Sequence, residues 1–359
     1  MNKSKLNVII NRGGSIDHVL YKLLSSIGRV VTMKRIICLL ISGLIFSANA
    51  CFAAGDDVER LLKKARRHFE PLPETMPGSE NDTAERIALG KKLFFETRLS
   101  INDSQSCASC HRLQNGFAGV DNLPTSPGAR GEQGSRNSPT VLNAGWQSSQ
   151  FWDGRAKDLV EQAKGPILNP IEMGMADEKT VENKIAAIAE YQLAFKRAFP
   201  GSAAALTYQN IAEAIAAFER TLRTPSRFDD FLNGDISALS LQEQQGLKTF
   251  IKLDCKQCHD GVLLGGESFE MMGKENPYDN QSDQGMYEVS KDDDDRMFFK
   301  VAPLRNVALT APYFHDGKVA SLDEAVRAMA WLQLNKKLTD QQVNEITAFL
   351  KSLTGKSRE

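Results

Sequence analysis

Two copies of one five-residue motif constrain this chain more than any other feature. Residues 107–111 (CASCH) and 255–259 (CKQCH) both read Cys-x-x-Cys-His. This spacing is the attachment pattern of a c-type haem, in which both cysteines form thioethers and the histidine supplies an imidazole ligand to the iron. The chain has only six Cys and five His, so two matches predict two covalently bound haem c groups. The predicted haem-binding residues are Cys107, Cys110, His111, Cys255, Cys258 and His259.

Zinc binding and disulfide chemistry are the alternatives for these cysteines. A structural zinc site would need two further Cys or His residues at matching spacing. A thioredoxin-like redox pair would not need the histidine. Cys38 lies in an apolar stretch near the start and Cys51 lies just after it, which leaves no further cysteine pair for a disulfide in the folded part.

Residues 1–53 read as an over-extended start followed by a signal peptide over 33–53. Met33-Lys34-Arg35 precedes the apolar run 36–46, and small residues follow up to Ala53. A basic start, a short apolar run and small residues before the cleavage point are typical of a secretory signal. Because covalent haem c is assembled outside the cytoplasmic membrane, both features predict a periplasmic protein. An uncleaved membrane anchor and a lipidated Cys51 are the alternatives, although Ala48 replaces the leucine expected before a lipidated cysteine.

The composition is that of a globular chain with an acidic folded part. It is 42% hydrophobic and 25% charged, and 359 residues are enough for two domains. Residues 1–53 hold seven Lys/Arg and one Asp, so the formal charge of −1 leaves 37 basic and 44 acidic residues, a net −7, in the remainder. This balance excludes a basic nucleic-acid-binding surface and is compatible with a basic protein partner.

Apolar periodicity predicts a mainly α fold with two cytochrome c-like haem domains, long irregular loops and little strand. Helices expected over 83–95 and 240–251 each precede a haem motif, and Gly90-x-Lys92-x-Phe94 matches Gly246-x-Lys248-x-Phe250. This repetition places an N-terminal haem domain at 54–225 and a C-terminal one at 226–359. Other expected helices cover 56–68, 179–198 (with Leu193 on the core face), 208–223, 322–334 and 339–353. We expect 112–176 to be irregular and 261–295, which ends in four aspartates, to be an exposed loop.

The two motifs differ in whether the sequence offers a second ligand for the haem iron. An iron with two strong ligands moves electrons, whereas an iron with an open face can also react. Met329 lies on the apolar face of the helix expected over 322–334 and is a candidate second ligand for the C-terminal haem, with core packing as the alternative. No His or Met occurs between His111 and Met173, so the first haem looks open. Outside the motifs and the start region, only His68 and His315 remain.

From about residue 57 to 356 the chain resembles the bacterial di-haem cytochrome c peroxidases, a family that includes the MauG-type enzymes. Besides the haem motifs, the resemblance rests on LFFxxxLS (93–100), RNSPT (136–140), QFWDGRA (150–156), GPIxNPxEM (165–173), LRNV (304–307) and PYFHDG (312–317). It implies a peroxidatic haem on His111 and an electron-entry haem on His259 and Met329, where MauG-type enzymes carry Tyr. It also implies reduction of hydrogen peroxide to water, electrons from a small cytochrome c or copper protein, and a homodimer.

The resemblance also assigns roles to individual positions. Glu172 matches the distal carboxylate that moves protons on peroxide, and Gln162 matches its partner. Trp152 matches the tryptophan between the haems, an electron relay, although a packing tryptophan is the alternative. Asn137 and the carbonyls of two further residues match a calcium site, whereas His315 matches a structural residue. The implied calcium ligands are Asn137, Thr310 and Pro312.

The chain departs from the family pattern at Ala129. Many relatives carry a histidine there that caps the peroxidatic iron in the resting oxidised state, and alanine cannot ligate iron. We therefore expect a first haem that is five-coordinate or holds only water, and an enzyme that needs no reductive activation. A MauG-like oxidase acting on a partner protein and a non-catalytic di-haem electron carrier are the other interpretations. Met329 argues against the first of these, whereas the missing capping histidine argues for it. Glu172, Gln162 and the open first haem argue against the second.

Overall fold

Side-chain caps start most of the longer helices. The computed structural model describes residues 57–114 and 116–356. Thr207, for example, accepts a hydrogen bond from Asn210 N at 3.1 Å, and Ser321 and Glu324 form a reciprocal capping box. After a helical segment over residues 57–65, the helices are α2 (Ala84–Phe94), α3 (Cys107–Cys110), α4 (Leu159–Leu168), α5 (Glu178–Ala186), α6 (Ala189–Ala198), α7 (Tyr208–Glu219), α8 (Arg227–Asn233), α9 (Leu241–Lys252), α10 (Tyr287–Ser290), α11 (Leu322–Leu334) and α12 (Asp340–Lys351).

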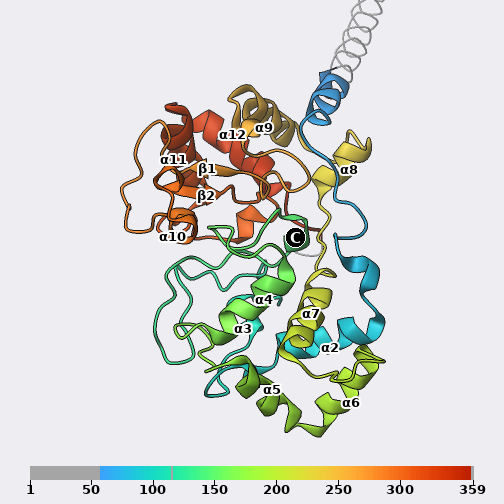
Figure 1. The fold of residues 1–359 in the computed structure, drawn as a ribbon. Coiled ribbons are helices and arrows are strands. Elements are labelled where there is room, and N and C mark those ends of the chain that lie inside the picture. The colour runs from blue at the N-terminus through green and yellow to red at the C-terminus, as the bar shows by residue number, and fades with distance from the viewer. Residues whose placement is uncertain (1–56, 115, 357–359) are drawn as a thin grey trace, which may run out of the picture. The chain divides into compact units, whose positions relative to one another are not determined.

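Two helix crossings repeat one packing arrangement. Helix α2 packs on α7, and α9 packs on α12. At each crossing a glycine lets the backbones touch, because a Cβ at Gly90 would overlap the carbonyl oxygen of Ala214 and one at Gly246 would overlap that of Glu345. Figure 1 shows α2, α5, α6 and α7 at one end of the unit that begins at Leu61, and α9, α11 and α12 at the other.

A buried aromatic pair accompanies each crossing. The Phe94 and Phe218 rings lie 5.3 Å apart, and the Phe250 and Phe349 rings lie 5.4 Å apart, with similar tilts of 64° and 60°. Burying a phenylalanine side chain stabilises a fold by about 1.5–3 kcal/mol. The Gly-x-Lys-x-Phe match in the sequence therefore corresponds to a repeated three-dimensional contact. The boundary at 225/226 stays a prediction, because the chain from Leu61 onward forms one compact unit.

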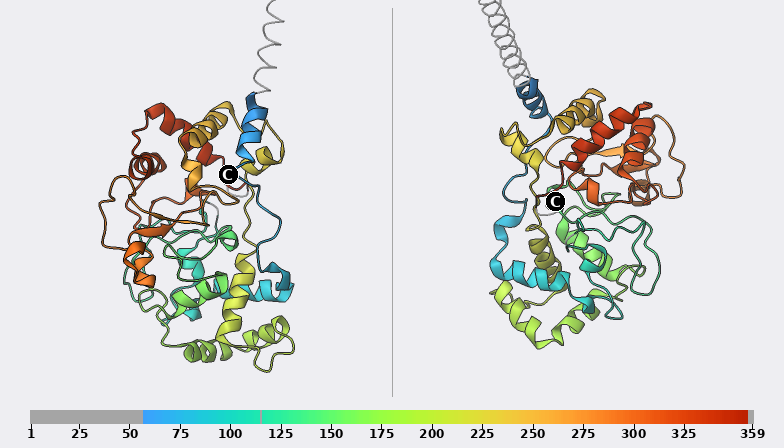
Figure 2. Two further views of the ribbon diagram at one scale, coloured as in Figure 1. Left: turned by 45° about the horizontal axis from the view of Figure 1, so that its top comes forward. Right: turned by 180° about the vertical axis from the view of Figure 1, so that it is seen from behind.

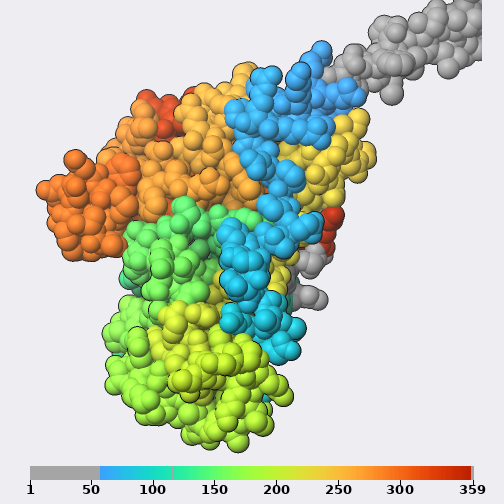
Figure 3. Space-filling model, turned by 45° about the vertical axis from the view of Figure 1, so that its right-hand side comes forward, coloured from blue at the N-terminus to red at the C-terminus, as the bar shows by residue number. Residues whose placement is uncertain are grey.

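Strand structure is scarce, as expected. Strands β1 (Phe269–Met271) and β2 (Phe298–Lys300) form an antiparallel two-stranded sheet, with Phe269 opposite Lys300 and Met271 opposite Phe298. The other regular pieces are short 3-10 helices at Ser79–Asn81, Thr97–Leu99, Ala144–Trp146, Cys255–Gln257, Asp293–Asp295 and Val307–Leu309. The mainly α prediction is confirmed. In Figure 3 the green part of the chain lies between the yellow-green helices and the orange segment.

The helix predicted over 179–198 is wrong as a single element. It divides into α5 and α6 because Ile188 adopts an extended conformation (φ −99°, ψ 107°). Helix α6 then turns Tyr191, Phe195 and Ala198 into the core. Leu193 is two residues from Tyr191, which is about 200° around a helix. It therefore points to solvent with 63% of its surface exposed, and its predicted core position is also wrong.

The region 112–176 is less irregular than predicted, because it contains α4. This helix starts at Asp158, whose carboxylate accepts the Glu161 amide at 2.9 Å. Its last turn includes Pro166, and the Pro166 carbonyl accepts the Met173 amide at 3.1 Å. Gly165-Pro166 is a typical loop signal, so the local sequence did not predict this helix, which is completed by tertiary packing. The two further views in Figure 2 show this helix among loops.

The other predicted elements agree with the structure where it describes them. Residues 57–65 are helical within the predicted 56–68, and α2, α7, α9, α11 and α12 match their predicted ranges closely. Asp292, Asp293 and Asp294 are exposed, as expected of the acidic loop. In the described part of the chain, no helix is long and apolar enough to cross a membrane. The predicted signal peptide at 33–53 lies outside the described residues.

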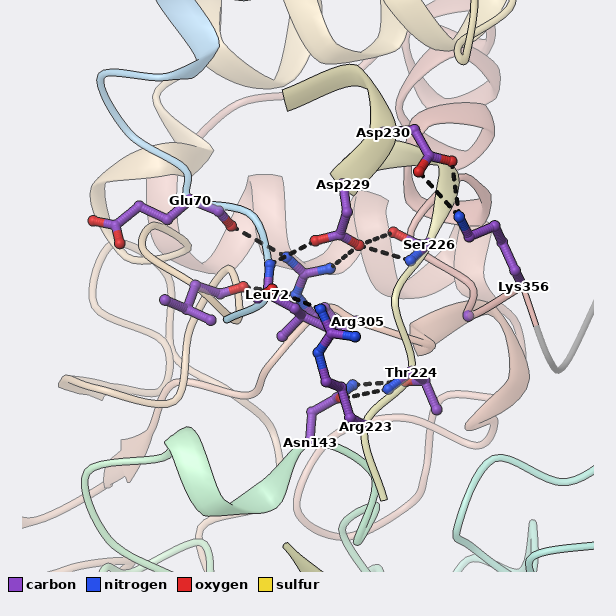
Figure 4. Close-up of polar contacts among 12 residues, drawn as sticks. Glu70, Leu72, Asn143, Arg223, Thr224, Ser226, Asp229, Asp230, Arg305 and Lys356 are labelled. Atoms are coloured by element: carbon purple, nitrogen blue, oxygen red, sulfur yellow. Dashed lines mark hydrogen bonds and ion pairs between the residues drawn. The ribbon is translucent and has the colours of Figure 1, made fainter. Parts of the chain in front are cut away.

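A buried arginine joins four segments that are far apart in sequence. Arg305, 1% exposed, donates to the carboxylate of Asp229 at 2.8 Å, to Val262 O at 2.6 Å and to Glu70 O at 3.2 Å. Asp229 also accepts the Leu72 amide at 2.7 Å. Figure 4 shows this network beside the segment that connects α7 to α8. One ion pair thus fixes that connection against both the start of the compact unit and the loop after the second haem motif.

Candidate functional site

Each haem motif opens into its own cavity. The first, which we call the N-terminal cavity, has a volume of about 180 Å³ and is lined by Cys107, Cys110 and His111. The second, the C-terminal cavity, has a volume of about 250 Å³. Its lining includes the residues of the second motif, Cys255, Cys258 and His259. The structure therefore brings each predicted set of haem-binding residues together.

Both motif histidines are held in the same way. The Nδ1 atom of His111 lies 3.2 Å from Gly119 O, and that of His259 lies 3.1 Å from Leu264 O. Burial lowers the pKa of both imidazoles, so the neutral ring with its proton on Nδ1 is favoured. A histidine that donates Nδ1–H to a carbonyl presents Nε2 to a metal. Both rings therefore suit an iron ligand.

None of the four motif cysteines forms a disulfide bond. Burial raises the pKa of Cys110 and of Cys255 to about 11, and it also raises the pKa values of Cys107 and Cys258. Neutral buried thiols suit thioether formation better than the thiolate ligation that zinc requires. Among the described residues, no group of three or more His, Cys, Asp or Glu is placed to hold a metal ion. The donor set fits haem c.

Trp152 lines both cavities. It sits in a tight hairpin closed by a bridge between Gln150 and Ala156, and its indole Nε1 donates to Asn137 O at 2.9 Å. Gly154 in the same turn has φ +69°, and a Cβ there would overlap the ring of Phe269. The residues that line both cavities are Asn137, Ser138, Pro139, Thr140, Gln147, Phe151, Trp152 and Lys300.

Glu172 and Gln162 both line the N-terminal cavity with His111. Gln162 projects from α4, and Glu172 lies in the turn just after that helix, where its amide donates to Asn169 O at 3.0 Å. Burial raises the pKa of the Glu172 carboxyl, although the charge of Arg155 and a hydrogen bond from Asn169 oppose this. Such a carboxyl is easier to protonate at neutral pH than an exposed one.

The loop around Ala129 packs directly against the Glu172 segment. The Ala129 amide donates to Glu172 O at 2.6 Å, and a Cβ at Gly128 would overlap Ile171 O. Pro127 lines the N-terminal cavity, and it forms a bridge with Gln133 that closes the loop. The loop is thus tied by its backbone to the segment that carries the candidate acid–base group.

Met329 projects from α11 into the C-terminal cavity, which the predicted helix face also lines through Ala325 and Val326. The side chain is partly buried and packs on a small cluster that includes Phe299 and Leu332. Met329 and His259 therefore line one cavity, as a second ligand requires.

The three predicted calcium ligands line the C-terminal cavity together. Asn137 lies in the RNSPT stretch, and its amide nitrogen Nδ2 donates to Leu123 O at 3.0 Å. Thr310 and Pro312 lie in the segment before α11. Segments far apart in sequence thus meet at one wall, and their carbonyl and amide oxygens are the ligand type that calcium prefers.

The remaining histidines differ from each other. His315 is buried, its ring stacks on Phe299 with centroids 4.1 Å apart, and it lines the C-terminal cavity. His68 is partly exposed and lines neither cavity. The sequence interpretation that neither histidine is an iron ligand stays a prediction.

Sequence reasoning assigned no role to Lys300, Arg155 and Glu219, which are among the charged residues that line the cavities. Lys300 lines both, and Arg155 lines the N-terminal cavity, where its guanidinium lies 3.5 Å from the Phe151 ring centre. Glu219 lines the N-terminal cavity from α7. For Lys300 a signal existed, because it interrupts the apolar run 297–302 (MFFKVA). Arg155 lies in the QFWDGRA stretch (150–156), which marked the segment but not the role of this side chain, and no comparable signal marks Glu219.

Comparisons with known proteins agree with this site. The family model described as di-haem cytochrome c peroxidase matches residues 84–237. The cytochrome c551 peroxidase of Pseudomonas aeruginosa is 45% identical over 305 residues, which cover 83% of this chain and 87% of that protein. The cytochrome c551 peroxidase of Nitrosomonas europaea is 43% identical over 319 residues, covering 88% of this chain and 91% of that protein.

A solved structure shows the same fold. It is a MauG-like protein associated with microbial copper homeostasis, with a TM-score of 0.71 and 30% identity, and the match covers 80% of this chain and 94% of that one. The two haem motifs, the two cavities and these similarities together show that this chain belongs to the di-haem cytochrome c peroxidase family, whose enzymes reduce hydrogen peroxide.

Proposed function

We propose that hydrogen peroxide is reduced to water in the N-terminal cavity by electrons that enter through the C-terminal cavity. The observation that carries this assignment is the position of Glu172 and Gln162 in the cavity of His111, while Met329 lines the cavity of His259. Bound haem supplies the redox-active iron in each cavity. The overall reaction consumes two electrons and two protons and releases two water molecules.

Glu172 is the proposed acid–base group. Cleavage of the peroxide bond needs a proton removed from one oxygen and delivered to the other, and a carboxylate in reach of both oxygens can do this. Burial raises the pKa of Glu172, which brings it closer to neutral pH and helps both transfers. Gln162 offers one acceptor and two donors, so it can orient peroxide beside Glu172.

Trp152 is the proposed electron relay. Its indole lines both cavities, and its hydrogen bond to Asn137 O fixes the ring plane. Electrons would enter at the cavity of Met329, because a methionine ligand raises the reduction potential of a haem relative to histidine alone. The proposed donor is a small periplasmic cytochrome c or cupredoxin, and the proposed enzyme is a periplasmic homodimer with two haem domains that meet near residue 225.

Turnover with peroxide and a reduced small cytochrome c tests this assignment. Glu172→Gln keeps the size and polarity of the side chain but removes the base, so we expect kcat to fall by about 10²–10⁴-fold. The matched control is Glu178→Gln, on the exposed first turn of α5. Wild-type protein that carries two haems but oxidises no donor when peroxide is added would favour an electron carrier. Oxidation of a partner protein instead would favour the MauG-like reaction.

We propose further that the N-terminal haem is open in the resting enzyme because Ala129 replaces the capping histidine, and that no reductive activation is needed. The loop is also held by the bond from its Ala129 amide to Glu172 O. An EPR spectrum of the fully oxidised protein as isolated should show one high-spin haem. Ala129→His should convert that signal to low-spin. Two low-spin haems in the wild-type protein would contradict the proposal.

A calcium ion held by Asn137, Thr310 and Pro312 is the last part of the proposed cofactor set. Oxygen-only ligands supplemented by water suit this ion. The three residues line one wall of the C-terminal cavity, and Asn137 also accepts the Trp152 indole bond through its backbone. Chelation should therefore lower the apparent Tm and slow electron transfer between the haems. Full recovery after calcium is added back, but not after magnesium, is the expected control.

A further inference from the structure

Lys300 lies where the two cavities meet. It is the last residue of β2, its side chain lines both cavities, and only 5% of its surface is exposed. Its backbone amide donates to Trp152 O at 2.8 Å. The lysine is thus tied through the backbone to the tryptophan at the same junction.

The partners that hold the Lys300 ammonium are neutral. Its Nζ donates to Ser149 O at 2.6 Å and to the side-chain oxygen of Gln147. The carboxylate that acts on it, Asp153, is already engaged by two guanidinium groups, Arg136 at 2.5 Å and Arg155 at 2.9 Å. No full negative charge is therefore reserved for Lys300 in this network.

The neighbouring strand does not supply a counter-ion either. Register places Phe269 opposite Lys300 and Glu270 opposite Phe299. Residues that face each other across an antiparallel pair share a face, and successive residues alternate. The Glu270 carboxylate is thus directed to the face opposite the one that Lys300 occupies.

A buried ammonium without an anionic partner is unfavourable. Burial lowers the pKa of Lys300 to about 7, and the charge of Asp153 only partly opposes this. An anion delivered into either cavity would remove the penalty through a charge-assisted hydrogen bond. The family's cofactor carries such groups, because haem has two propionate carboxylates.

We propose that Lys300 is the counter-ion of a haem propionate at the junction of the two cavities. A fixed positive charge beside a haem favours the reduced iron, so Lys300 raises the reduction potential of the haem that it contacts. The inference needs two bound haems but does not depend on peroxide turnover. Failure of the proposed activity would leave it intact, and its own failure would leave the activity intact.

The proposed effect of the Lys300 charge is tested by measuring the reduction potentials of both haems in the holoprotein. Lys300→Met removes it, and Lys300→Gln removes it while keeping a donor for Ser149 O. In both variants we expect at least one haem to become harder to reduce, by tenfold or more in the equilibrium constant, which is about 59 mV for one electron. The control is Lys184→Met, because Lys184 pairs with Asp103 at 2.5 Å and lines neither cavity. Unchanged potentials of both haems in either Lys300 variant would overturn the proposal.

A crystal structure of the wild-type holoprotein tests the contact directly and does not depend on how the variants fold. We expect Lys300 Nζ within hydrogen-bonding distance of a propionate oxygen. An ammonium that contacts only Gln147 and Ser149, or that binds a buffer anion in place of a propionate, would refute the assignment.

Discussion

Replacing Arg305 with methionine removes the centre of the most buried ion pair described in this chain. The guanidinium is 1% exposed and the Asp229 side chain is 6% exposed, with 2.8 Å between them. The substitution also deprives Val262 O and Glu70 O of donors at 2.6 and 3.2 Å (Figure 4). Methionine matches the length of the apolar stem, so lost polar contacts dominate over lost volume.

The expected loss in the free energy of unfolding depends on the hydrogen-bond partners that Asp229 keeps. Breaking a buried pair by removing one side typically costs about 3–5 kcal/mol. Asp229 keeps the Leu72 amide at 2.7 Å and the Ser226 donors at 2.7 and 2.9 Å, which favours the lower end. At about 2 °C for each kcal/mol in large domains, Tm should fall by about 6 °C.

The pH dependence should change as well. Burial alone would raise the pKa of Asp229, but the Arg305 charge and the hydrogen bonds outweigh burial and hold it below its ordinary value. A carboxyl with a lowered folded-state pKa stabilises the fold above its unfolded pKa of about 3.9, and this is lost as pH falls. Without Arg305 that lowering shrinks. The stability that Asp229 loses on acidification should then be smaller in Arg305→Met, so the Tm difference between this variant and the wild-type protein should narrow as pH falls below about 3.9.

The assay is thermal unfolding of the holoprotein by circular dichroism for Arg305→Met, Asp229→Asn and the double variant. If the pair is coupled, the double variant is less destabilised than the sum of the single variants by about 1 kcal/mol or more. Additivity within about 0.5 kcal/mol would refute the reasoning, because it would mean that the two side chains contribute independently.

Three other outcomes can be checked in the same holoprotein. Gly246→Ala places a Cβ 2.8 Å from Phe349 Cβ and onto a backbone carbonyl, so we expect the free energy of unfolding to fall by about 1–3 kcal/mol or more in a thermal unfolding experiment. The control Gly165→Ala, whose added Cβ has its nearest neighbour at 3.4 Å, should lower it less. Burial raises the pKa of Glu219 to about 8, so the fold should lose stability as pH rises from about 4.5 to 8, and Glu219→Gln should abolish that slope in a Tm-versus-pH series. Trp152→Phe should slow electron transfer between the haems in stopped-flow reduction while leaving haem content unchanged, and an unchanged rate would exclude the relay role.

Short-range signals made much of the fold predictable. The capping residue Ser321 and the Gly-x-Lys-x-Phe repeats act over a few residues, so they can be recognised directly in the sequence. Helix α4 and the break at Ile188 were not predictable in this way. Each depends on which face the neighbouring helices leave uncovered, and that is decided only when distant segments pack.

The site shows the same division. The motifs locate both haem attachments, and the family resemblance points to Glu172 and Trp152. The buried position of Lys300 depends on Trp152 O and Ser149 O, which belong to a hairpin about 150 residues earlier in the chain. A lysine within an apolar run indicates a buried charge, but the partners of that charge cannot be identified from the sequence. They are determined by the packing of β2 against that hairpin.

The two haem motifs have equivalent proximal sides, so the difference between the cavities must arise elsewhere. His111 and His259 present the same ring nitrogen to a backbone carbonyl at nearly equal distances, and burial lowers the pKa of both. Equal proximal ligands would by themselves give similar irons. A division into a reacting centre and an electron-transfer centre therefore has to come from the remaining lining, which includes Glu172 in one cavity and Met329 in the other. Exchanging these distal residues, rather than the motifs, is the change that should exchange the roles.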